Sequence, residues 1–464
     1  MTSWTPDLTR RSGPRYRALA DALADDVAGG RLAAGARLPT HRDMAASLGV
    51  TVGTVSRGYA EAQRRGLISG EVGRGTFVRR ADDDRIEFGM PAIREASLID
   101  LSLNFPISET EDREVARALL DLSRRKDLAG LLSYLPHAGL PAHRDAGAAW
   151  AARAGFEARP DQILITNGAQ QALSIALAAL AAPGDLVLTE ALTYPLFRTL
   201  AGLLHLKIQG LPMDDQGLKP EAFEAACRAG APRFLYCIPT IQNPTVSIMP
   251  EARRRRIAAI AQAHGVTILE DDIYGILPEE RPAPIALHAP DHVIYVTSLS
   301  KTLTPGLRIG YLLAPRRLLD RIVPAMGATT WMASPLMAEL ATRFIGDGTA
   351  DLILKRRRKE TAARLEMAAR ILRPARAGAH PHSYHFWLPL PEPWKSDEFA
   401  SRLRERGVAV TPAEAFLAAA GKPPAAIRIC LGAARTRDQL ERGLRIIADT
   451  LAGAPGPPGE AAII

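Results

Sequence analysis

The stretch TSLSKTLTPGLRIGY, residues 297–311, places one lysine among hydroxyl side chains, a Pro-Gly turn and an arginine. It directly follows an apolar run, residues 292–296, that is typical of a buried strand. Hydroxyls, backbone N–H groups at a turn and a guanidinium all bind phosphate. The stretch therefore predicts an anion site beside the amine of Lys301, which an ordinary surface lysine would not need.

The chain has 464 residues, which is enough for two or more domains that each bury a core. Its charged fraction of 23% and hydrophobic fraction of 47% are those of an ordinary globular protein. The most apolar stretch, residues 172–182, is well short of the ~20 residues that span a bilayer. The N-terminus lacks a signal-type apolar core. We therefore expect a cytoplasmic protein with no membrane partner.

Three cysteines, Cys227, Cys237 and Cys430, are isolated from one another and show no metal-ligand spacing. Cys227 and Cys430 lie in apolar helix and strand patterns, where a free thiol packs as a small hydrophobe. We therefore predict no metal site, and the odd count fits a reducing compartment.

The first 80 residues hold thirteen basic and seven acidic side chains, so most of the net charge of +8 lies there. A basic small domain is a candidate for contact with a polyanion, although a solvated charged face is the more frequent explanation. A motif is needed to decide between the two.

That motif is a pair of short helices around Gly49. Residues 15–27 predict a first helix, which stops at a Gly-Gly pair. Thr40 begins a second helix that ends at Gly49, and Thr51 caps a third that ends at Gly66. The two helices that flank Gly49 form a helix-turn-helix pattern.

Residues 67–80, LISGEVGRGTFVRR, add a strand, a glycine-rich turn and a second strand, which predicts a wing. Together with LPTHRDMA at residues 38–45, this region resembles the GntR-type winged helix. The resemblance implies that the third helix enters the major groove of double-stranded DNA. The residues expected to contact DNA are Arg42, Thr51, Gly53, Thr54, Arg57, Arg74 and Gly75.

One departure from the family pattern concerns base specificity. Val52-Gly53 stands where many members have Arg-Asn, so a bidentate reader of guanine is missing there. Arg64 and Arg65 are better explained as a solvated helix end than as DNA contacts.

We expect four segments along the chain. Residues 1–80 form the DNA-binding domain, and residues 81–99 form a linker that changes the sign of its charge and loses periodicity. Residues 100–452 form the large domain, and the Pro/Gly-rich residues 453–464 form a disordered tail.

In the large domain, short β-rich runs alternate with helical patterns, which predicts an α/β fold with a mainly parallel sheet covered by helices. Ligands on such sheets collect at the carboxyl ends of the strands. The loops that follow the first four runs are NGAQQ (167–171), ALTY (191–194), PTIQNPT (239–245) and DDIYG (271–275), and the lysine segment follows the fifth.

These five loops, in this order, resemble the fold-type I pyridoxal-phosphate enzymes of aminotransferase class I/II, over about residues 100–450. The resemblance implies a small C-terminal α+β subdomain and pyridoxal 5'-phosphate bound as an imine to the catalytic Lys301. Asp271 would pair with the pyridine nitrogen and favour the protonated ring. Tyr274 and Asn243 would bond the ring oxygen, and Tyr194 would stack on the ring.

The same resemblance assigns the phosphate and the substrate. The residues expected to hold the phosphate are Gly168, Ala169, Gln170, Ser298, Ser300 and Arg308. Tyr134 matches a position that reaches the phosphate of a neighbouring subunit, which implies a homodimer. Arg428 matches the arginine that clamps a substrate α-carboxylate.

Each of these residues also has a plainer explanation. Asp271 and Asp272 could simply end a strand, Tyr194 could be core, and Arg428 could pair with a surface carboxylate. Lys301 requires all of the functional assignments together, which favours them as a set. Two departures remain, since Val246 replaces the usual glycine of Asn-Pro-Thr-Gly and His143 stands where leucine is common.

A GntR-type winged helix joined to an aminotransferase-like domain resembles the MocR family of regulators. The implied function is a DNA-binding regulator that senses an amino compound, or the cofactor itself, through external aldimine formation at Lys301. One alternative is a working aminotransferase with an accessory winged helix, and a second is a regulator with an empty pocket. The identity of the amine, the operator sequence and the sign of regulation are not readable from the sequence.

Overall fold

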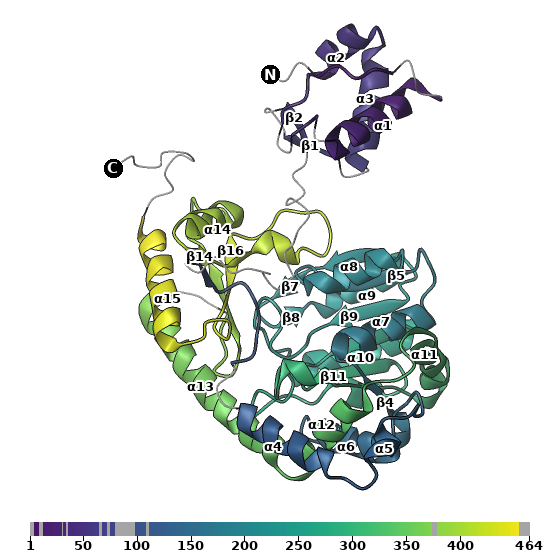
Figure 1. The fold of residues 1–464 in the computed structure, drawn as a ribbon, viewed down its shortest axis with the longest axis vertical. Helices are drawn as coiled ribbons and strands as arrows, with labels where there is room; N and C mark the ends of the chain where they lie inside the picture. Colours follow the sequence, from purple (N-terminus) through teal and green to yellow (C-terminus); the bar gives the residue numbers. More distant parts are fainter. Residues whose placement is uncertain are drawn as a thin grey trace. The chain divides into compact units, whose positions relative to one another are not determined.

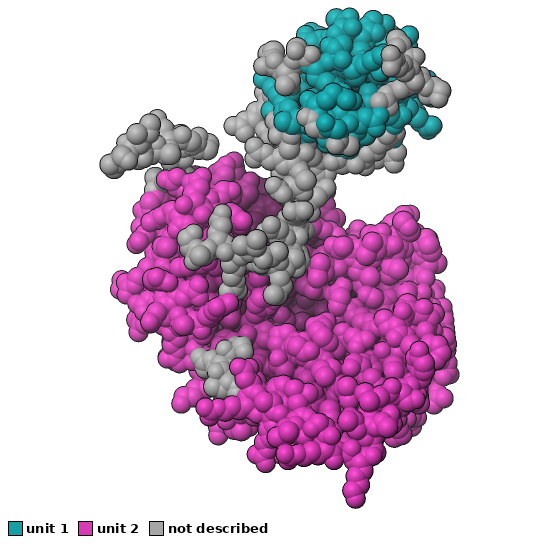
Figure 2. Space-filling model, in the orientation of Figure 1, with its two compact units in different colours: residues 1–93 teal, residues 94–464 magenta. Residues whose placement is uncertain are grey.

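The structure is a computed structural model, and it describes residues 4–8, 13–29, 31–33, 36–64, 67–71, 75–78, 98–107, 111–373 and 378–453. The chain divides into two compact units, residues 1–93 and residues 94–464, which are coloured separately in Figure 2. The predicted linker, except for its last two residues, and the predicted tail after residue 453 lie outside the described residues.

In its described residues, the first unit contains three helices and a two-stranded sheet. Its elements are α1 (Arg15–Ala28), α2 (His41–Leu48), α3 (Val52–Arg64), β1 (Ile68–Glu71) and β2 (Gly75–Val78). The strands pair antiparallel, as expected for a wing, with Ile68 opposite Val78. Helices α1 and α3 approach closely, because a Cβ at Gly58 would lie 2.8 Å from Leu19 Cδ2.

Local sequence signals determine the helix ends of this unit. Thr40 Oγ1 accepts a hydrogen bond from Asp43 N at 3.2 Å and so caps α2. Gly49 ends α2 with φ = 61°, a left-handed conformation that glycine adopts without a Cβ clash. Thr51 Oγ1 accepts from Thr54 N at 3.2 Å at the start of α3. The predicted turn between the two helices is present.

The second unit contains a seven-stranded sheet with the order β4-β12-β11-β10-β9-β5-β6 (Figure 1). The strands are β4 (Ile163–Thr166), β5 (Leu186–Glu190), β6 (Lys207–Leu211), β9 (Phe234–Cys237), β10 (Thr267–Asp271), β11 (Val293–Ser298) and β12 (Gly310–Leu313). All neighbouring pairs are parallel except those made by β12 with β11 and β4. The sheet is therefore mainly parallel, as predicted, and the antiparallel β12 is a strand that the sequence analysis did not identify.

Helices cover this sheet, and two further strands form a small hairpin. The helices are α4 (Glu111–Ser123), α5 (Leu128–Leu131), α6 (Pro141–Ala152), α7 (Ala169–Leu180), α8 (Pro195–Leu203), α9 (Pro220–Ala229), α10 (Glu251–His264), α11 (Arg316–Thr329) and α12 (Pro335–Gly346); the hairpin is β7 (Met213–Asp214) and β8 (Gly217–Leu218). Apolar residues from the sheet and these helices form one large core. Six of the seven strands are mostly continuous buried runs because both of their faces are covered, whereas the edge strand β6 alternates between exposed and partly buried residues.

The C-terminal part of the second unit is smaller and has a core of its own. It contains α13 (Thr349–Leu372), β13 (His385–Pro389), α14 (Ser396–Glu405), β14 (Val408–Ala409), β15 (Thr411–Pro412), β16 (Ala426–Cys430) and α15 (Arg437–Ala452). Strands β13, β16 and β15 form an antiparallel sheet, and β14 pairs parallel with β3 (Ile99–Asp100). This is the expected α+β subdomain.

Helix α13 joins the two cores of this unit (Figure 1). Ile353 and Leu354 belong to the large core, whereas Ala368 and Leu372, about four turns further on, belong to the small one. Between them lie the buried polar residues Arg357, Glu360, Thr361 and Arg364. The middle of α13 is therefore polar, and it lies between the two apolar cores.

Candidate cofactor site and DNA interface

The carboxyl ends of the parallel strands carry the predicted cofactor residues. Because β4, β11, β10, β9 and β5 run in the same direction, their following loops open on one edge of the sheet. Lys301 follows β11, Asp271 ends β10, and Asn243 follows β9. Residues that are far apart in sequence thus meet at one edge.

Lys301 is held by two hydrogen bonds to other segments. Its Nζ donates to the backbone oxygen of Asn104, and its own backbone oxygen accepts from the Tyr384 hydroxyl at 2.6 Å. Burial lowers the pKa of the Lys301 amine to about 8, and the neighbouring Arg428 favours the neutral form further. A lysine with a pKa this close to physiological pH keeps a substantial neutral fraction there, and the neutral amine is the nucleophile that attacks an aldehyde.

Asp271 and its neighbour Asp272 differ in their partners, which the sequence could not reveal. Asp272 Oδ2 accepts from Tyr295 at 2.6 Å and from Arg281 at 2.6 Å, so its charge is balanced. Asp271 Oδ2 accepts from the Tyr236 hydroxyl at 2.7 Å, and the Oδ1 atoms of both aspartates are buried without a hydrogen-bond partner among the described residues. The difference is that Asp272 is ion-paired with Arg281, whereas no ion pair of Asp271 occurs within the described parts of the chain. Burial raises the pKa of Asp271 to about 6. Asp271 therefore has an open acceptor, as a partner of a protonated ring nitrogen needs.

Tyr274 is buried and is oriented by Asn104, a residue that the sequence analysis missed. Asn104 Nδ2 donates to the Tyr274 hydroxyl oxygen at 2.8 Å and lies 3.2 Å from His385 Nδ1. Because its oxygen accepts, the Tyr274 hydroxyl is free to donate its own hydrogen to a ligand. Asn104 lies in an irregular segment outside any motif, so no local signal could have identified it.

Arg428 is only 2% exposed and has no carboxylate partner in the part of the chain that the structure describes. It donates to Asn243 Oδ1 at 2.8 Å and to Ser102 O at 2.7 Å, and its Nε has no partner. Its guanidinium lies 4.8 Å from the centre of the Phe416 ring. Pairing with a surface carboxylate, the plainer explanation, is therefore wrong for the described residues. A buried cation without a counter-ion favours an anionic ligand.

The predicted phosphate residues form a tight cradle. Gly168, with φ = 86°, precedes α7, and a Cβ there would lie 2.8 Å from Arg308 Nη2. The Arg308 guanidinium donates to Asn167 O at 3.3 Å and to Ser300 Oγ at 3.4 Å. A Cβ at Gly310 would lie 2.7 Å from the carbonyl carbon of Gly168. Ala169 and Gln170 begin α7, whose free N–H groups favour an anion.

Three further predicted residues take different places. Ser298 is buried and donates to Ile309 O at 3.0 Å, so it organises the loop around Lys301. Tyr194 is half-buried at the start of α8, and burial together with Asp271 raises its pKa to about 12. Tyr134 is 79% exposed, and its ring centre lies 5.2 Å from that of the exposed Trp331. The role of Tyr134 at the phosphate of a neighbouring subunit therefore stays a prediction.

These side chains fit pyridoxal phosphate. The unpaired Asp271 Oδ1, the amine of Lys301 with its lowered pKa, and the Gly168 cradle that a Cβ would fill correspond to its ring nitrogen, aldehyde and phosphate. Other described residues supply no competing assignment, since no group of three or more metal-ligating side chains lies together among them.

Comparisons with known proteins agree with both halves of the chain. Residues 96–447 match the family model of aminotransferase class I and II, and residues 15–78 match that of bacterial regulatory proteins of the gntR family. The chain is 32% identical over 445 residues to the uncharacterized HTH-type transcriptional regulator YdeF of Bacillus subtilis, covering 96% of each. It is 27% identical to the probable rhizopine catabolism regulatory protein MocR of Rhizobium meliloti, covering 78% of this chain and 77% of that one.

The chain belongs to the MocR family of transcriptional regulators.

The MocR architecture explains why the second unit resembles enzymes. It is similar to LysN, the α-aminoadipate aminotransferase of Thermus thermophilus, with a TM-score of 0.68, 27% identity, and coverage of 77% of this chain and 92% of that one. This confirms the predicted fold-type I architecture, whose family depends on pyridoxal phosphate. Among the described residues, no helix is both long and apolar enough to cross a bilayer.

The GntR-type half of this MocR protein implies DNA binding. Arg42 on α2 and Thr51, Gly53 and Arg57 around the first turns of α3 are exposed, and Thr54 is half-buried. Val52, which stands where many members of the family have arginine, is also exposed. Gly75 begins strand β2, and Arg74 lies outside the described residues.

Proposed function

We propose that this regulator carries pyridoxal phosphate on Lys301 and converts the binding of a small amino compound into a change of DNA affinity. The observation that carries the proposal is that Lys301 and Arg428 both donate hydrogen bonds to residues 102–104. In the chain, this segment comes directly after the expected linker.

The segment is held in place by the site from several directions. Ser102 O accepts from Arg428 Nη2 at 2.7 Å and from Thr411 Oγ1 at 3.1 Å, and Cys430 N donates to Leu101 O at 2.8 Å. Asn104 uses its backbone oxygen for Lys301 and its side chain for Tyr274. Any change at these donors therefore acts directly on the start of the second unit.

In the proposal, the empty site and the ligand-bound site differ in the hydrogen bonds that Lys301 and Arg428 donate to this segment. Pyridoxal phosphate supplies an aldehyde that exchanges a lysine amine for the amine of an incoming compound. Lys301 cannot keep donating an ammonium hydrogen to Asn104 O once its nitrogen is committed to the cofactor. A ligand carboxylate competes with Ser102 O for Arg428. Because the exchange frees the lysine amine again, each liganded state lacks one of these two hydrogen bonds, and one bond of about 1 kcal/mol would give about a fivefold coupling, at the lower end of the usual allosteric range.

We further propose that the protein is a homodimer and acts in the cytoplasm, where its DNA is. Leu132 and Tyr134 are exposed on the chain, and Trp331, which packs against Tyr134, is 49% exposed. Side chains of this kind favour burial in an interface. Sedimentation equilibrium of wild type and Leu132→Glu tests this, with a purely monomeric wild type as the contradicting result.

The sensing proposal is tested by operator affinity. We expect pyridoxal phosphate together with an α-amino acid to change the Kd of wild type about fivefold or more. Lys301→Ala should not respond to either compound, and Arg428→Gln should respond only to the cofactor. The matched ligand control is the decarboxylated amine of the same amino acid, which lacks the group that Arg428 would bind. Equal Kd values for all combinations would contradict the proposal.

A second candidate is a working aminotransferase. The complete set of Lys301, Asp271, Tyr274 and Arg428 at one edge of the sheet favours it, as does the similarity to LysN. An aminotransferase would convert the bound cofactor to its pyridoxamine form in a single turnover and would then turn over repeatedly when a keto acid is added. This activity would distinguish it from a sensor. Turnover without any ligand effect on DNA affinity would favour the enzyme over the sensor.

A further inference from the structure

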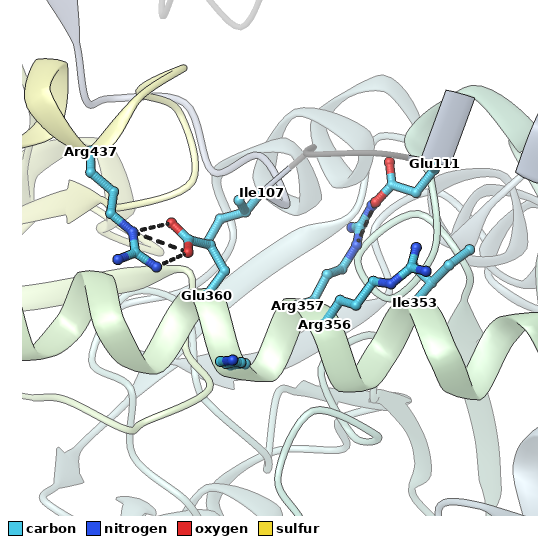
Figure 3. A pocket seen from close by; sticks show the side chains of 8 residues that line it. Ile107, Glu111, Ile353, Arg356, Arg357, Glu360 and Arg437 are labelled. Carbon is cyan, nitrogen blue, oxygen red and sulfur yellow. Dashed lines mark hydrogen bonds and ion pairs between the residues drawn. The ribbon is translucent and has the colours of Figure 1, made fainter. Parts of the chain in front are cut away.

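Buried polar side chains also occur in the second unit outside the predicted cofactor residues. One group, on the middle of α13, consists of ion pairs, since Arg357 pairs with Glu111 and Glu360 pairs with Arg437 (Figure 3). These charges neutralise one another, so this group needs no ligand. Another group is centred on His385, the first residue of β13, which is fully buried.

The two ring nitrogens of His385 have different partners. Its Nε2 lies 3.2 Å from the backbone oxygen of Gln242, and its Nδ1 lies 3.2 Å from Asn104 Nδ2. Because a carbonyl oxygen only accepts, the hydrogen of a neutral ring must be on Nε2, and Nδ1 must be an acceptor. Burial, assisted by the nearby cations Arg428 and Lys301, lowers the pKa of His385 to about 3, so the ring is neutral.

Asn104 is the donor at this acceptor. The other neighbour of His385 Nδ1 is Ser383 Oγ at 3.4 Å, but the single hydrogen of that hydroxyl is donated to His385 O at 2.7 Å. One hydrogen of Asn104 Nδ2 is therefore used at His385 Nδ1. The other is donated to the hydroxyl oxygen of Tyr274 at 2.8 Å.

These bonds fix the orientation of the Asn104 amide. If the amide turned over, its oxygen would face His385 Nδ1, and two acceptors would oppose each other without a hydrogen between them. The Tyr274 oxygen is thus kept as an acceptor, and its own hydrogen points away from Asn104. With an apolar side chain at position 385, the amide could turn over, and the Tyr274 hydroxyl would then donate to Asn104 Oδ1.

We propose that His385 is a positioning residue, which holds the Asn104 amide so that the Tyr274 hydroxyl donates its hydrogen to the bound ligand. The inference rests on the proposed function, in which that ligand is pyridoxal phosphate and the acceptor is its ring oxygen. His385 acts through Asn104 and Tyr274 and is not itself a catalytic residue.

The visible absorbance of the bound cofactor over a pH series tests the proposal. A hydrogen bond donated to the ring oxygen stabilises negative charge there and so lowers the pKa of the neighbouring imine. His385→Leu should therefore raise the midpoint of the absorbance change by about 1 pH unit. The matched control is His143→Leu, since His143 is also buried but bonds Glu339 at 3.2 Å, and it should leave the midpoint unchanged.

The decisive comparison is a double-mutant cycle with Tyr274→Phe, which removes the hydroxyl itself. Both single variants should raise the midpoint, and the double variant should have the midpoint of Tyr274→Phe alone, because His385 acts only through that hydroxyl. An additive shift in the double variant would overturn the proposal, as would an unchanged midpoint in His385→Leu. Circular dichroism melts establish that each variant is folded.

A second measurement uses the full-length protein without cofactor, so it is independent of the proposed function. Nitrogen-15 spectra of histidine-labelled wild type should show the His385 hydrogen on Nε2 near neutral pH, and Asn104→Leu should shift the Nδ1 signal. The signals of this ring are assigned by their loss in His385→Gln.

A hydrogen on Nδ1, or an Nδ1 signal that does not respond to Asn104→Leu, would overturn the proposal even if the cofactor binds. A wild type that binds no pyridoxal phosphate would contradict the proposed function alone. The assignment of His385 would then stand or fall on the cofactor-free spectra.

Discussion

At the carboxyl ends of the sheet strands, Asp271 and Arg428 are removed from water, whereas Arg42 and Arg57 on the helix-turn-helix are exposed to it. In the first region, burial shifts pKa values and leaves Asp271 Oδ1 and Arg428 Nε without partners. In the second region, the arginines keep their hydration until a polyanion arrives. Ligand binding at the sheet edge would therefore depend on buried groups that lack hydrogen-bond partners. Binding by the helix-turn-helix would depend on exposed charges, whose attraction to a polyanion is screened by salt.

The largest effect that tests this contrast is expected at Asp271. Asp271→Asn should weaken pyridoxal phosphate binding about 150- to 5,000-fold, because losing one partner of a buried charge pair costs about 3–5 kcal/mol. Visible absorbance on titration with the cofactor measures it. The control is Asp272→Asn, which removes a carboxylate balanced by Arg281 and should lower the free energy of unfolding instead. Equal cofactor affinity for wild type and Asp271→Asn would show that the open oxygen is not used.

The pH dependence of cofactor attachment is the next largest effect. Burial lowers the pKa of Lys301 to about 8, and only the neutral amine attacks an aldehyde. The attachment rate should therefore rise about fiftyfold from pH 6 to pH 8 and then level off. Stopped-flow absorbance measures this rate. An inflection near 10.5, the ordinary lysine value, would contradict a buried amine.

On the exposed side, Arg57→Gln should weaken operator binding about tenfold and reduce the slope of log K against log salt by about 1. The matched control is Arg17→Gln, an exposed arginine of α1 outside the helix-turn-helix. Fluorescence anisotropy over a salt series measures both variants. If the loss persisted unchanged at high salt, Arg57 would act as a base reader and not through phosphate.

The smallest effect concerns Val246, which has φ = 66° and is buried beside Asn243. A left-handed backbone costs a residue with a Cβ roughly 1–2 kcal/mol. Val246→Gly should therefore be about 1 kcal/mol more stable than Val246→Ala, although it buries less apolar surface. Urea unfolding of the two variants measures the difference. If Val246→Ala were more stable than Val246→Gly, the backbone at this turn would have relaxed out of the left-handed conformation, and the prediction would be wrong.

Local patterns predicted much of this molecule because they act over a few residues. Thr40, Gly49 and Thr51 set helix ends by capping, and α1 ends one residue beyond its predicted range. The apolar runs predicted β4, β5, β9, β10 and β11, since strands covered on both faces have no alternation. Strand β12 was missed because its first residues, Gly310 and Tyr311, close the segment around Lys301 that was interpreted as a binding loop.

Long-range pairing limited the prediction of the site. The sequence could not tell Asp271 from Asp272, because the difference lies in Tyr236, Tyr295 and Arg281 on other segments. Tyr236 lies inside an apolar strand and gave no polar signal. The DNA contacts, the domain boundaries and the role of Tyr134 between subunits remain predictions.

The antiparallel strand β12 has a consequence for how this site can change. Because the chain turns back after Lys301 and re-enters the sheet between β11 and β4, one hairpin delivers both the amine and Arg308, and it brings Gly310 against Gly168. A single inserted or deleted residue between 299 and 309 would displace both groups at once. If the proposed cofactor site is correct, imine chemistry and phosphate recognition are inherited as a unit, and a descendant that loses one through a length change should lose the other.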